Sequence, residues 1–386
     1  MSLEQSFRSP WIDDELEMLG DQVARFLDRE MVPHAERWDR EGMVDRAAWA
    51  KAGEAGILCA SVPVEYGGGG GTRAHEAVII QEIARAGLGG GFGVGNTISS
   101  GIVAHYILAY GTEEQKQRWL PAMARGTRIG AIAMTEPGAG SDLQNIRTRA
   151  VAAQGGWLVS GQKTFISNGQ NADLIVVVAR TGDAGAKGIS LLVVETEGAE
   201  GFRRGRNLDK LGMHAQDTSE LFFDDVFVPA DNVLGAPGQG FPQLMNQLAW
   251  ERMIIGLDAV VNMERAVALT TTYVRERSAF GKALIDFQNT QFVLADCATQ
   301  ATVARAMIDT MMTRLLAGEL DAVTAAKVKL WTTETQFKLI DACQQLFGGY
   351  GYMTEYPIAR LFADARVSRV YGGANEIMKL IIARAL

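Results

Sequence analysis

The chain has 386 residues and a mass of 41.7 kDa, and 47% of its residues are hydrophobic. This length predicts roughly two to three domains with a sizeable core, which excludes a largely disordered chain. The 37 basic and 45 acidic residues give a net charge of −8, which argues against nucleic acid as a partner.

The start of the chain carries no targeting pattern. Residues 1–15 lack a basic stretch followed by an apolar run, so they predict neither a signal peptide nor a transit peptide. Apolar runs such as 174–179 are far shorter than the roughly 18 residues of a membrane helix. Cys59, Cys297 and Cys343 show no CxxC spacing, so we expect neither a disulfide framework nor a zinc ribbon. We therefore expect a soluble cytoplasmic protein without a membrane span.

Residues 1–127 predict a helical N-terminal domain. Glycine clusters at 66–71 and 87–95 predict loops between helices. Thr112 followed by Gln115 predicts a capping box at the start of a later helix. One early segment places apolar residues at helical spacing on a single face, namely Leu16, Leu19, Val23, Phe26 and Leu27.

The pattern changes to β over residues 128–234 and returns to helix over residues 235–386. The β prediction rests on short apolar or alternating runs between turn signals, at 157–159, 174–179, 189–194 and 221–228. Long helical patterns with few breakers then cover 245–274, 288–317 and 322–347. The expected order is therefore helical, β, helical.

Several common catalytic motifs are missing from the sequence. Neither GxGxxG nor GxxxxGK[ST] occurs, which argues against a Rossmann or P-loop nucleotide site. The four histidines are isolated and form no HExxH or other ligand spacing, so we expect no metal site. Ser141 lacks the GxSxG setting of a nucleophile, and a serine in a glycine loop more often bonds to backbone.

A glycine-rich stretch, TEPGAGSD at 135–142, exposes backbone N–H groups that suit polar ring edges or phosphate oxygens, although an ordinary tight turn is the simpler alternative. Further motifs follow it in a fixed order. Together the motifs strongly resemble the acyl-CoA dehydrogenase family. The resemblance rests on 135–142, on GQKTFISNG at 161–169, RERSAFGK at 275–282 and FGGYGY at 347–352, and on flanking matches at 110–116 and 364–373.

This resemblance implies an α+β multidomain fold with FAD between the middle domain and the C-terminal helices. The implied domains are an N-terminal helical domain (1–127), a middle antiparallel β domain (128–234) and a C-terminal four-helix bundle (235–386). The residues implied to bind FAD are Ile132, Met134, Thr135, Gly140, Ser141, Phe165, Ile166, Ser167, Arg277, Phe280, Gln288, Gln345, Leu346, Phe347, Gly348, Gly349, Ala374, Asn375 and Glu376.

Three of these residues, Arg277, Phe280 and Gln288, are implied to reach FAD from a neighbouring subunit, and the resemblance implies a homotetramer. The family pattern often has Trp at Phe165 and Thr at Ser167, and it often has Thr at Ala279 and Ala374. Hydroxyl contacts at these last two positions are therefore absent or replaced in this chain.

The implied reaction removes the α proton and a β hydride from an acyl thioester, so it needs a carboxylate base of raised pKa. Many family members carry this glutamate two residues before the Thr of a YEGT motif, but this sequence has Gly372 there. Glu376 lies four residues later, where the family pattern contacts the cofactor. The long-chain and isovaleryl branches carry the base on an earlier helix, and LAWERM at 248–253 resembles that pattern. We therefore expect Glu251 to be the base.

The spacing around Glu251 agrees with this assignment independently of the family. Leu244, Leu248, Glu251 and Ile255 lie on one helical face, which places the carboxylate on an apolar stripe. The alternative is a structural glutamate at the rim of a core helix or one paired with Arg252. Neighbours at i and i+1 do not face one another, which weakens the pairing with Arg252.

Substrate contacts are also implied by the resemblance. The Gly372 N–H, with a flavin ribityl hydroxyl, would stabilise the negative charge that develops on the thioester oxygen. Arg252 would help to hold the CoA end of the substrate. The remaining implied substrate-binding residues are Ser141 and Gly373.

The sequence thus predicts FAD-dependent α,β-dehydrogenation of a medium, long or branched acyl-CoA to trans-2-enoyl-CoA, with an electron-transferring flavoprotein as acceptor. One alternative is an acyl-CoA oxidase that uses dioxygen, and another is a silent flavin or acyl-CoA binding homologue, which Gly372 motivates. The stretch 87–95 falls near the family's acyl pocket and either leaves room for a long or branched chain or forms only a flexible turn. Chain length and acyl carrier are not fixed by the sequence.

Overall fold

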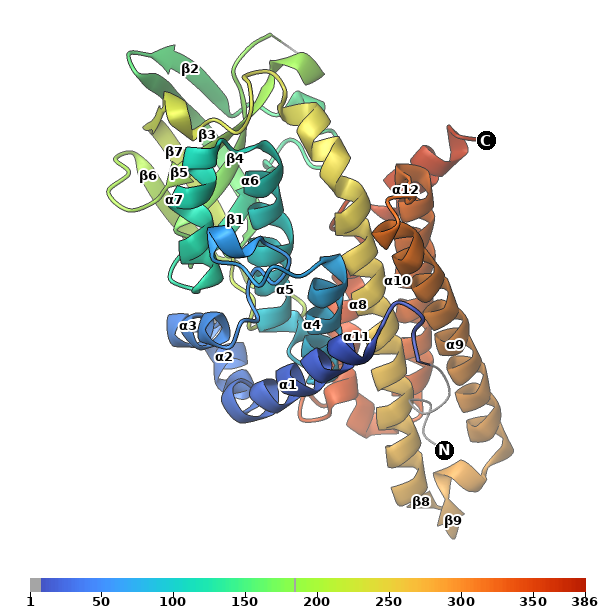
Figure 1. Cartoon of the computed structure of the whole chain (residues 1–386). Helices are drawn as coiled ribbons and strands as arrows, with labels where there is room; N and C mark the ends of the chain where they lie inside the picture. Colours follow the sequence, from blue (N-terminus) through green and yellow to red (C-terminus); the bar gives the residue numbers. More distant parts are fainter. Residues whose placement is uncertain (1–7, 184) are drawn as a thin grey trace.

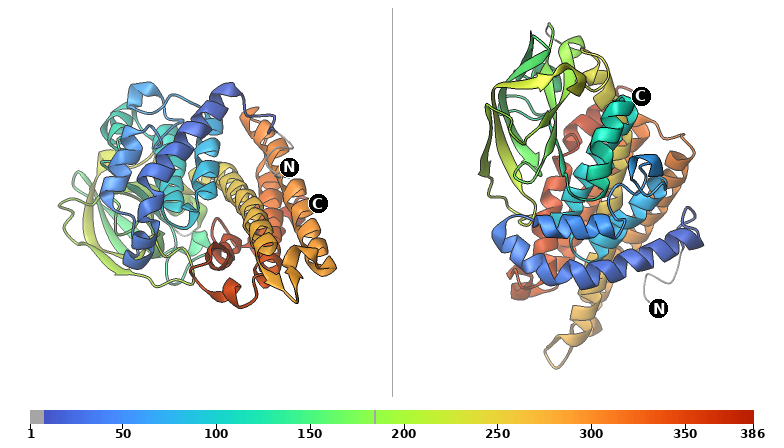
Figure 2. Two further views of the ribbon diagram at one scale, coloured as in Figure 1. Left: turned by 90° about the horizontal axis from the view of Figure 1, so that it is seen from below. Right: turned by 60° about the vertical axis from the view of Figure 1, so that its left-hand side comes forward.

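The computed structural model describes residues 8–183 and 185–386. Helices come first along the chain, a β-sheet follows, and long helices end it, which confirms the predicted order (Figure 1). The sheet lies beside the N-terminal helices at one end of the molecule, and the C-terminal helices run along its length (Figure 2).

The N-terminal region consists of helices whose apolar faces pack into two hydrophobic clusters. The predicted apolar face of α1 is confirmed, since Leu16, Val23, Phe26 and Leu27 are buried and Leu19 packs against the core. The predicted capping box between Thr112 and Gln115 is also confirmed at the start of α7. The helices are α1 (Asp14–Glu30), α2 (Ala35–Glu41), α3 (Arg46–Glu54), α4 (Arg73–Arg85), α5 (Val94–Asn96), α6 (Ala104–Tyr110) and α7 (Glu113–Ala124).

The prediction of a loop over 87–95 is wrong, because the chain is helical from Gly89 onward. A π-helical segment, Gly89–Gly93, leads into α5, and a second one, Thr97–Val103, leads into α6. The glycines serve close packing here. A Cβ on Gly91 would lie 2.6 Å from the Cβ of Ala215, and no side chain fits in that space.

The middle region is a seven-stranded sheet of order β1-β4-β2-β3-β7-β6, with β5 on β4. The expected antiparallel character holds for most pairs, but β1 and β2 each run parallel to β4, so the sheet is mixed. β4 is buried almost throughout, and apolar and polar residues do not alternate along it. The apolar run at 174–179 therefore did not indicate whether this strand runs parallel or antiparallel to its neighbours. The strands are β1 (Gly130–Ala133), β2 (Arg149–Ala153), β3 (Gly156–Ser167), β4 (Leu174–Arg180), β5 (Ile189–Glu195), β6 (Phe202–Asn207) and β7 (Thr218–Pro229).

The C-terminal region is built on three long helices. The expected four-helix bundle has short helices in place of a fourth long one, since α11 packs on α10 and α8 and α12 packs on α10. A small hairpin projects beyond the far end of α8 (Figures 1 and 2). The elements are α8 (Gly240–Glu276), α9 (Gln288–Leu316), α10 (Ala322–Gln345), α11 (Pro357–Ala365) and α12 (Asn375–Ala383), with β8 (Ser278–Ala279) and β9 (Lys282–Ala283).

α8 is the element that all three regions share. It packs against α4 and α6 of the N-terminal region, against β5 of the sheet, and against α9, α10 and α11. Residues on the first half of α8 therefore lie where the regions meet. No helix of the described residues is long and apolar enough to cross a membrane, and all three cysteines of the chain are buried and unpaired.

Candidate active site

The carboxylate of Glu251 is buried in the first half of α8, with 4% of the residue exposed. The hydroxyl of Tyr106, from α6, donates a hydrogen bond to its Oε1 at 3.0 Å. Burial raises the pKa of Glu251 to about 7, while the hydrogen bond from Tyr106 and the charge of Arg252 pull it down. The side chain therefore combines isolation from water with a pKa near neutrality, as a general base requires.

The apolar stripe predicted along α8 surrounds this carboxylate. Leu244 and Ile255 are buried one or two turns away on the same face, and Leu248 is partly buried. Within the described residues, no ion pair joins Glu251 to Arg252 or to any other cation. The alternative of a glutamate paired with Arg252 therefore finds no support in the geometry.

Gly372 and Gly373 form a turn that lies against the same face of α8. Both have positive φ angles, +65° and +91°, which strain residues that carry a Cβ. A Cβ on Gly372 would lie 2.3 Å from Cδ1 of Ile255, one helical turn after Glu251. A glutamate at 372 would take a strained backbone conformation and would have to displace the Cδ1 of Ile255, whereas a backbone N–H is retained there.

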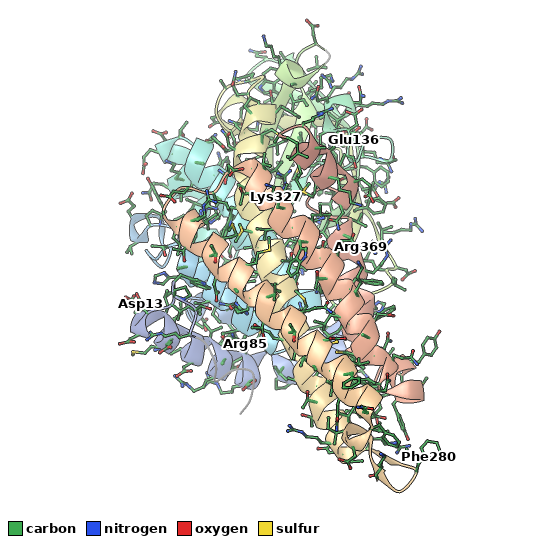
Figure 3. The ribbon with its side chains drawn as sticks, turned by 90° about the vertical axis from the view of Figure 1, so that its right-hand side faces the viewer. Asp13, Arg85, Glu136, Phe280, Lys327 and Arg369 are labelled. Atoms are coloured by element: carbon green, nitrogen blue, oxygen red, sulfur yellow. The ribbon has the colours of Figure 1, made fainter. Side chains whose placement is uncertain are left out.

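A buried lysine fixes this glycine turn. Lys329, fully buried on α10, donates from Nζ to the Gly373 carbonyl at 2.9 Å and to Oδ1 of Asn375 at 2.7 Å. The amide of Asn375 donates in turn to Glu334, which also accepts from Arg369. Figure 3 labels Arg369. Burial lowers the pKa of Lys329 to about 8, with the nearby charge of Arg252 the next cause.

This network changes the interpretation of Asn375. Its side chain is 2% exposed and is engaged by interior groups, so the predicted contact with a cofactor would have to come from its backbone. Glu376 is exposed and Ala374 is partly exposed. The sequence patterns did not reveal Lys329, because its partners lie more than 40 residues away in the chain.

A second buried lysine anchors the glycine-rich loop of the middle region. Lys163, in β3, donates from Nζ to the Met134 carbonyl and to the Glu136 carboxylate, each at 2.9 Å. Glu136 also accepts from the backbone N–H groups of Arg147 and Thr148. The ion pair is buried on both sides, so it holds the loop at the ends of β1 and β3 in one place.

The surface that this loop presents fits a flavin. The hydroxyls of Thr135, Ser141 and Ser167 have no hydrogen-bond partner among the described residues, so they are available to polar ring edges. Phe165 sits at a bulge of β3 with φ +59°, and 66% of it is exposed. An uncovered aromatic face beside free hydroxyls suits a planar, heteroatom-rich ring.

The other residues predicted in this region contribute in different ways. The side chains of Ile132 and Ile166 are buried in the hydrophobic core, so only their backbones can face a ligand. Met134 is partly buried, and Gly140 is exposed with open space where a Cβ would be.

The structure places the remaining predicted cofactor residues at the opposite end of the helical bundle. Phe280, 96% exposed, lies at the tip of the hairpin far from Glu136, as Figure 3 shows. Arg277 follows the last residue of α8, roughly 35–40 Å from Glu251 at 1.5 Å per residue. Arg277 lies over the ring of Tyr350, and the segment 345–349 ends α10 beside it. Gln288 begins α9 and is exposed.

The cofactor residues of the middle region and those at the far end of the helical bundle cannot both contact one flavin within a single chain. Phe347 is buried and its ring stacks on Tyr273 at 4.1 Å, while Gly348 and Gly349 are exposed next to it. Gln345 is exposed and Leu346 is partly exposed. A site that uses both groups therefore requires a second copy of the chain.

Arg252 stands out for its lack of partners. The residue is 4% exposed, and its Nε has no hydrogen-bond partner among the described residues. Burial lowers the pKa of Arg252, and Glu251 counteracts this effect. A buried cation with an unused donor next to the base is suited to receive an acceptor group from a ligand.

Comparisons with known proteins identify a family. Three family models match the chain, described as the acyl-CoA dehydrogenase N-terminal domain over residues 13–127, the middle domain over 131–226 and the C-terminal domain over 238–386. The long-chain specific acyl-CoA dehydrogenase, mitochondrial, of Mus musculus is 44% identical over 96% of this chain and 86% of its own length.

Solved structures share the whole fold. An acyl-CoA dehydrogenase from Geobacillus kaustophilus aligns with a TM-score of 0.94 and 45% identity, over 98% of this chain and 99% of that one. A chain from a structure entitled an electron transferring flavoprotein of Acidaminococcus fermentans aligns with a TM-score of 0.92 and 34% identity, over 97% and 98% of the two chains.

The turn that Lys329 holds generates a first prediction. Replacing Lys329 by Met removes the donor to the Gly373 carbonyl and to Oδ1 of Asn375, so we expect the free energy of unfolding to fall by about 1–3 kcal/mol. Because the Gly372 N–H loses its support, reduction of bound flavin by acyl-CoA should slow at unchanged flavin content. Thermal melts and stopped-flow flavin absorbance measure both quantities.

The matched control is Lys327→Met, two residues earlier on α10, where the lysine is exposed (Figure 3). If both variants behave like the parent protein, the network does not support the turn.

Proposed function

The chain belongs to the acyl-CoA dehydrogenase family, and we propose that in this enzyme Glu251 removes the α proton of a long-chain acyl-CoA. The protein is an FAD-dependent oxidoreductase that dehydrogenates an acyl-CoA at its α and β carbons. The single observation that carries the proposal is the buried Glu251 carboxylate, whose pKa of about 7 lets it both hold and release a proton near neutral pH.

The surroundings of Glu251 support its role as the base. Proton abstraction from a carbon next to a thioester needs a base that is shielded from water, because hydration lowers the basicity of a carboxylate. The turn at Gly372 brings a backbone N–H to the same face of α8, where it would stabilise negative charge on the thioester oxygen. Arg252 would hold a polar part of the substrate with its unused donor.

FAD, when bound, accepts the hydride from the β carbon. We propose that Thr135, Ser141, Phe165 and Ser167 hold it in one chain, on the loop that Lys163 anchors. Arg277, Phe280 and Gln288, together with 345–349, would reach it from another copy, because they lie at the far end of the bundle. This division of the cofactor residues supports a homo-oligomer, and the family resemblance implies a tetramer.

The two alternative functions have less support. The mouse relative and the Geobacillus structure are both named acyl-CoA dehydrogenases, which does not favour an oxidase. A silent homologue was motivated by Gly372, but the carboxylate missing at that position is matched by Glu251 on the adjacent helix.

An electron-transferring flavoprotein is our proposed electron acceptor. It is supported by the similarity to a chain from a structure that bears this name. A cytoplasmic location also stays a proposal, since the mouse relative is mitochondrial.

The long acyl chain is proposed from the identity of 44% to the long-chain specific enzyme of mouse. Gly93 of the glycine segment gives no support for a long acyl chain. A Cβ on Gly93 would lie 2.9 Å from Cγ2 of Ile83 and 3.2 Å from the Leu88 carbonyl, so its missing side chain faces the core. Enlarging Gly93 would therefore test packing rather than the width of an acyl pocket.

Chain length is tested by anaerobic titration of the flavin-loaded protein with palmitoyl-CoA, octanoyl-CoA and isovaleryl-CoA. We expect palmitoyl-CoA to bleach the visible flavin absorbance at the lowest concentration. Preferential bleaching by isovaleryl-CoA would contradict the long-chain proposal and leave the dehydrogenase assignment standing.

The base is tested by Glu251→Gln, which keeps the size of the side chain and removes its basicity. We expect flavin content and folding to be retained and the rate of flavin reduction by acyl-CoA to fall at least ~100-fold. Glu319→Gln, in an exposed loop, is the matched control and should reduce flavin normally. Near-normal reduction in Glu251→Gln would show that another group takes the proton.

A further inference from the structure

Tyr106 is fully buried in α6, and its hydroxyl has one hydrogen-bond partner among the described residues, the Oε1 of Glu251 at 3.0 Å. A buried phenol hydroxyl without a partner is destabilising, so the contact explains why a tyrosine rather than a phenylalanine stands here. The nearby Tyr110 is engaged elsewhere, because its hydroxyl donates to the carbonyl of Gln243.

Further contacts join α8 to the neighbourhood of α6 next to this hydrogen bond. Trp250, the residue before Glu251, donates from Nε1 to the Gly101 carbonyl at 2.9 Å. Its ring also meets His105, the residue before Tyr106, edge to face at 6.2 Å. Trp250 and Glu251 are adjacent on α8, and they contact His105 and Tyr106, which are adjacent on α6. These paired contacts limit how far the Tyr106 hydroxyl and the Glu251 carboxylate can separate.

The position of His105 is itself fixed by a buried pair. Its Nε2 lies 2.9 Å from the carboxylate of Glu76 on α4, and the hydroxyl of Ser61 donates to the same carboxylate at 2.6 Å. Arg73, from the first turn of α4, lies over the ring of Trp250 at 4.8 Å. Neither Arg73 nor His105 hydrogen-bonds Glu251 among the described residues.

The charged and titratable groups that act on Glu251 are therefore few. Tyr106 acts from α6 and Arg252 from α8, and both favour the ionised carboxylate against the effect of burial. Lys329 on α10 is close enough to Arg252 for the charge of Arg252 to lower the pKa of this lysine. Tyr106 is the only one of the three that hydrogen-bonds the carboxylate.

We propose that Tyr106 is a positioning residue for the base, whose hydroxyl holds the Glu251 carboxylate in place and favours its ionised form before substrate arrives. This inference rests on the proposed role of Glu251. A hydrogen bond donated to an ionised group is stronger than one between neutral groups. It offsets part of the cost of burying the charge, so the base stays available near neutral pH without a paired cation.

The test is the pH dependence of flavin reduction by palmitoyl-CoA in the flavin-loaded enzyme. In the parent enzyme we expect the rate to rise with pH through a midpoint near 7, because Glu251 must lose its proton to act. In Tyr106→Phe the ionised form loses its donor, so the midpoint should move up by about one to two pH units. A merely structural role would lower the rate at every pH without moving the midpoint.

Tyr110→Phe is the matched control, because it makes the same change one turn later on α6 and should leave the midpoint in place. If Tyr106→Phe does not fold, difluorotyrosine at position 106 keeps the shape and strengthens the donor, and it should move the midpoint down. An unmoved midpoint in a folded, flavin-loaded Tyr106 variant would overturn this inference.

The base assignment fails separately. If Glu251→Gln still reduces flavin at a normal rate, Glu251 is not the base, whatever happens at Tyr106.

Discussion

The proposed chemistry depends on keeping one carboxylate away from water. Glu251 lies on an apolar face of α8, at the place where the N-terminal helices, the sheet and the C-terminal bundle all contact that helix. Burial alone would protonate it, and the hydroxyl of Tyr106 with the nearby charge of Arg252 offsets part of that effect. The balance leaves a pKa of about 7, which neither a solvated nor an unassisted buried glutamate has.

Two buried lysines hold backbone segments of the candidate site in place. Lys163 ties the glycine-rich loop to Glu136 and the Met134 carbonyl, and Lys329 ties the Gly372–Gly373 turn to α10. Each ammonium binds a backbone carbonyl of a segment that contains glycine and would otherwise be free to move. The cost of burying each charge is offset by its charged or amide partner, and the result is a backbone that is in place before a ligand binds.

Sequence patterns revealed those features that depend on neighbours along the chain. The apolar face of α1, the capping box of α7 and the stripe that carries Glu251 follow from local spacing, and the structure has all three. Local spacing also misled at 87–95, where glycines pack inside a helix rather than forming a loop. The parallel neighbours of β4 were missed because a strand buried on both faces shows no alternation.

Long-range contacts were out of reach of such patterns. The partner of Glu251 lies 145 residues away, and those of Lys163 and Lys329 lie 27 to 46 residues away, so no motif joins them. The inward side chain of Asn375 was missed for the same reason, because a family position says nothing about which way an amide points.

The central claim is that Glu251 titrates near neutrality inside the folded protein. Infrared difference spectra of the flavin-loaded enzyme between pH 5 and 9, with Glu251→Gln as reference, observe this carboxyl group directly. A protonated carboxyl band that disappears with a midpoint near pH 7, and that is missing from the variant, is the result that the account predicts. A spectrum in which the variant and the parent enzyme differ by no band titrating in this range would contradict it.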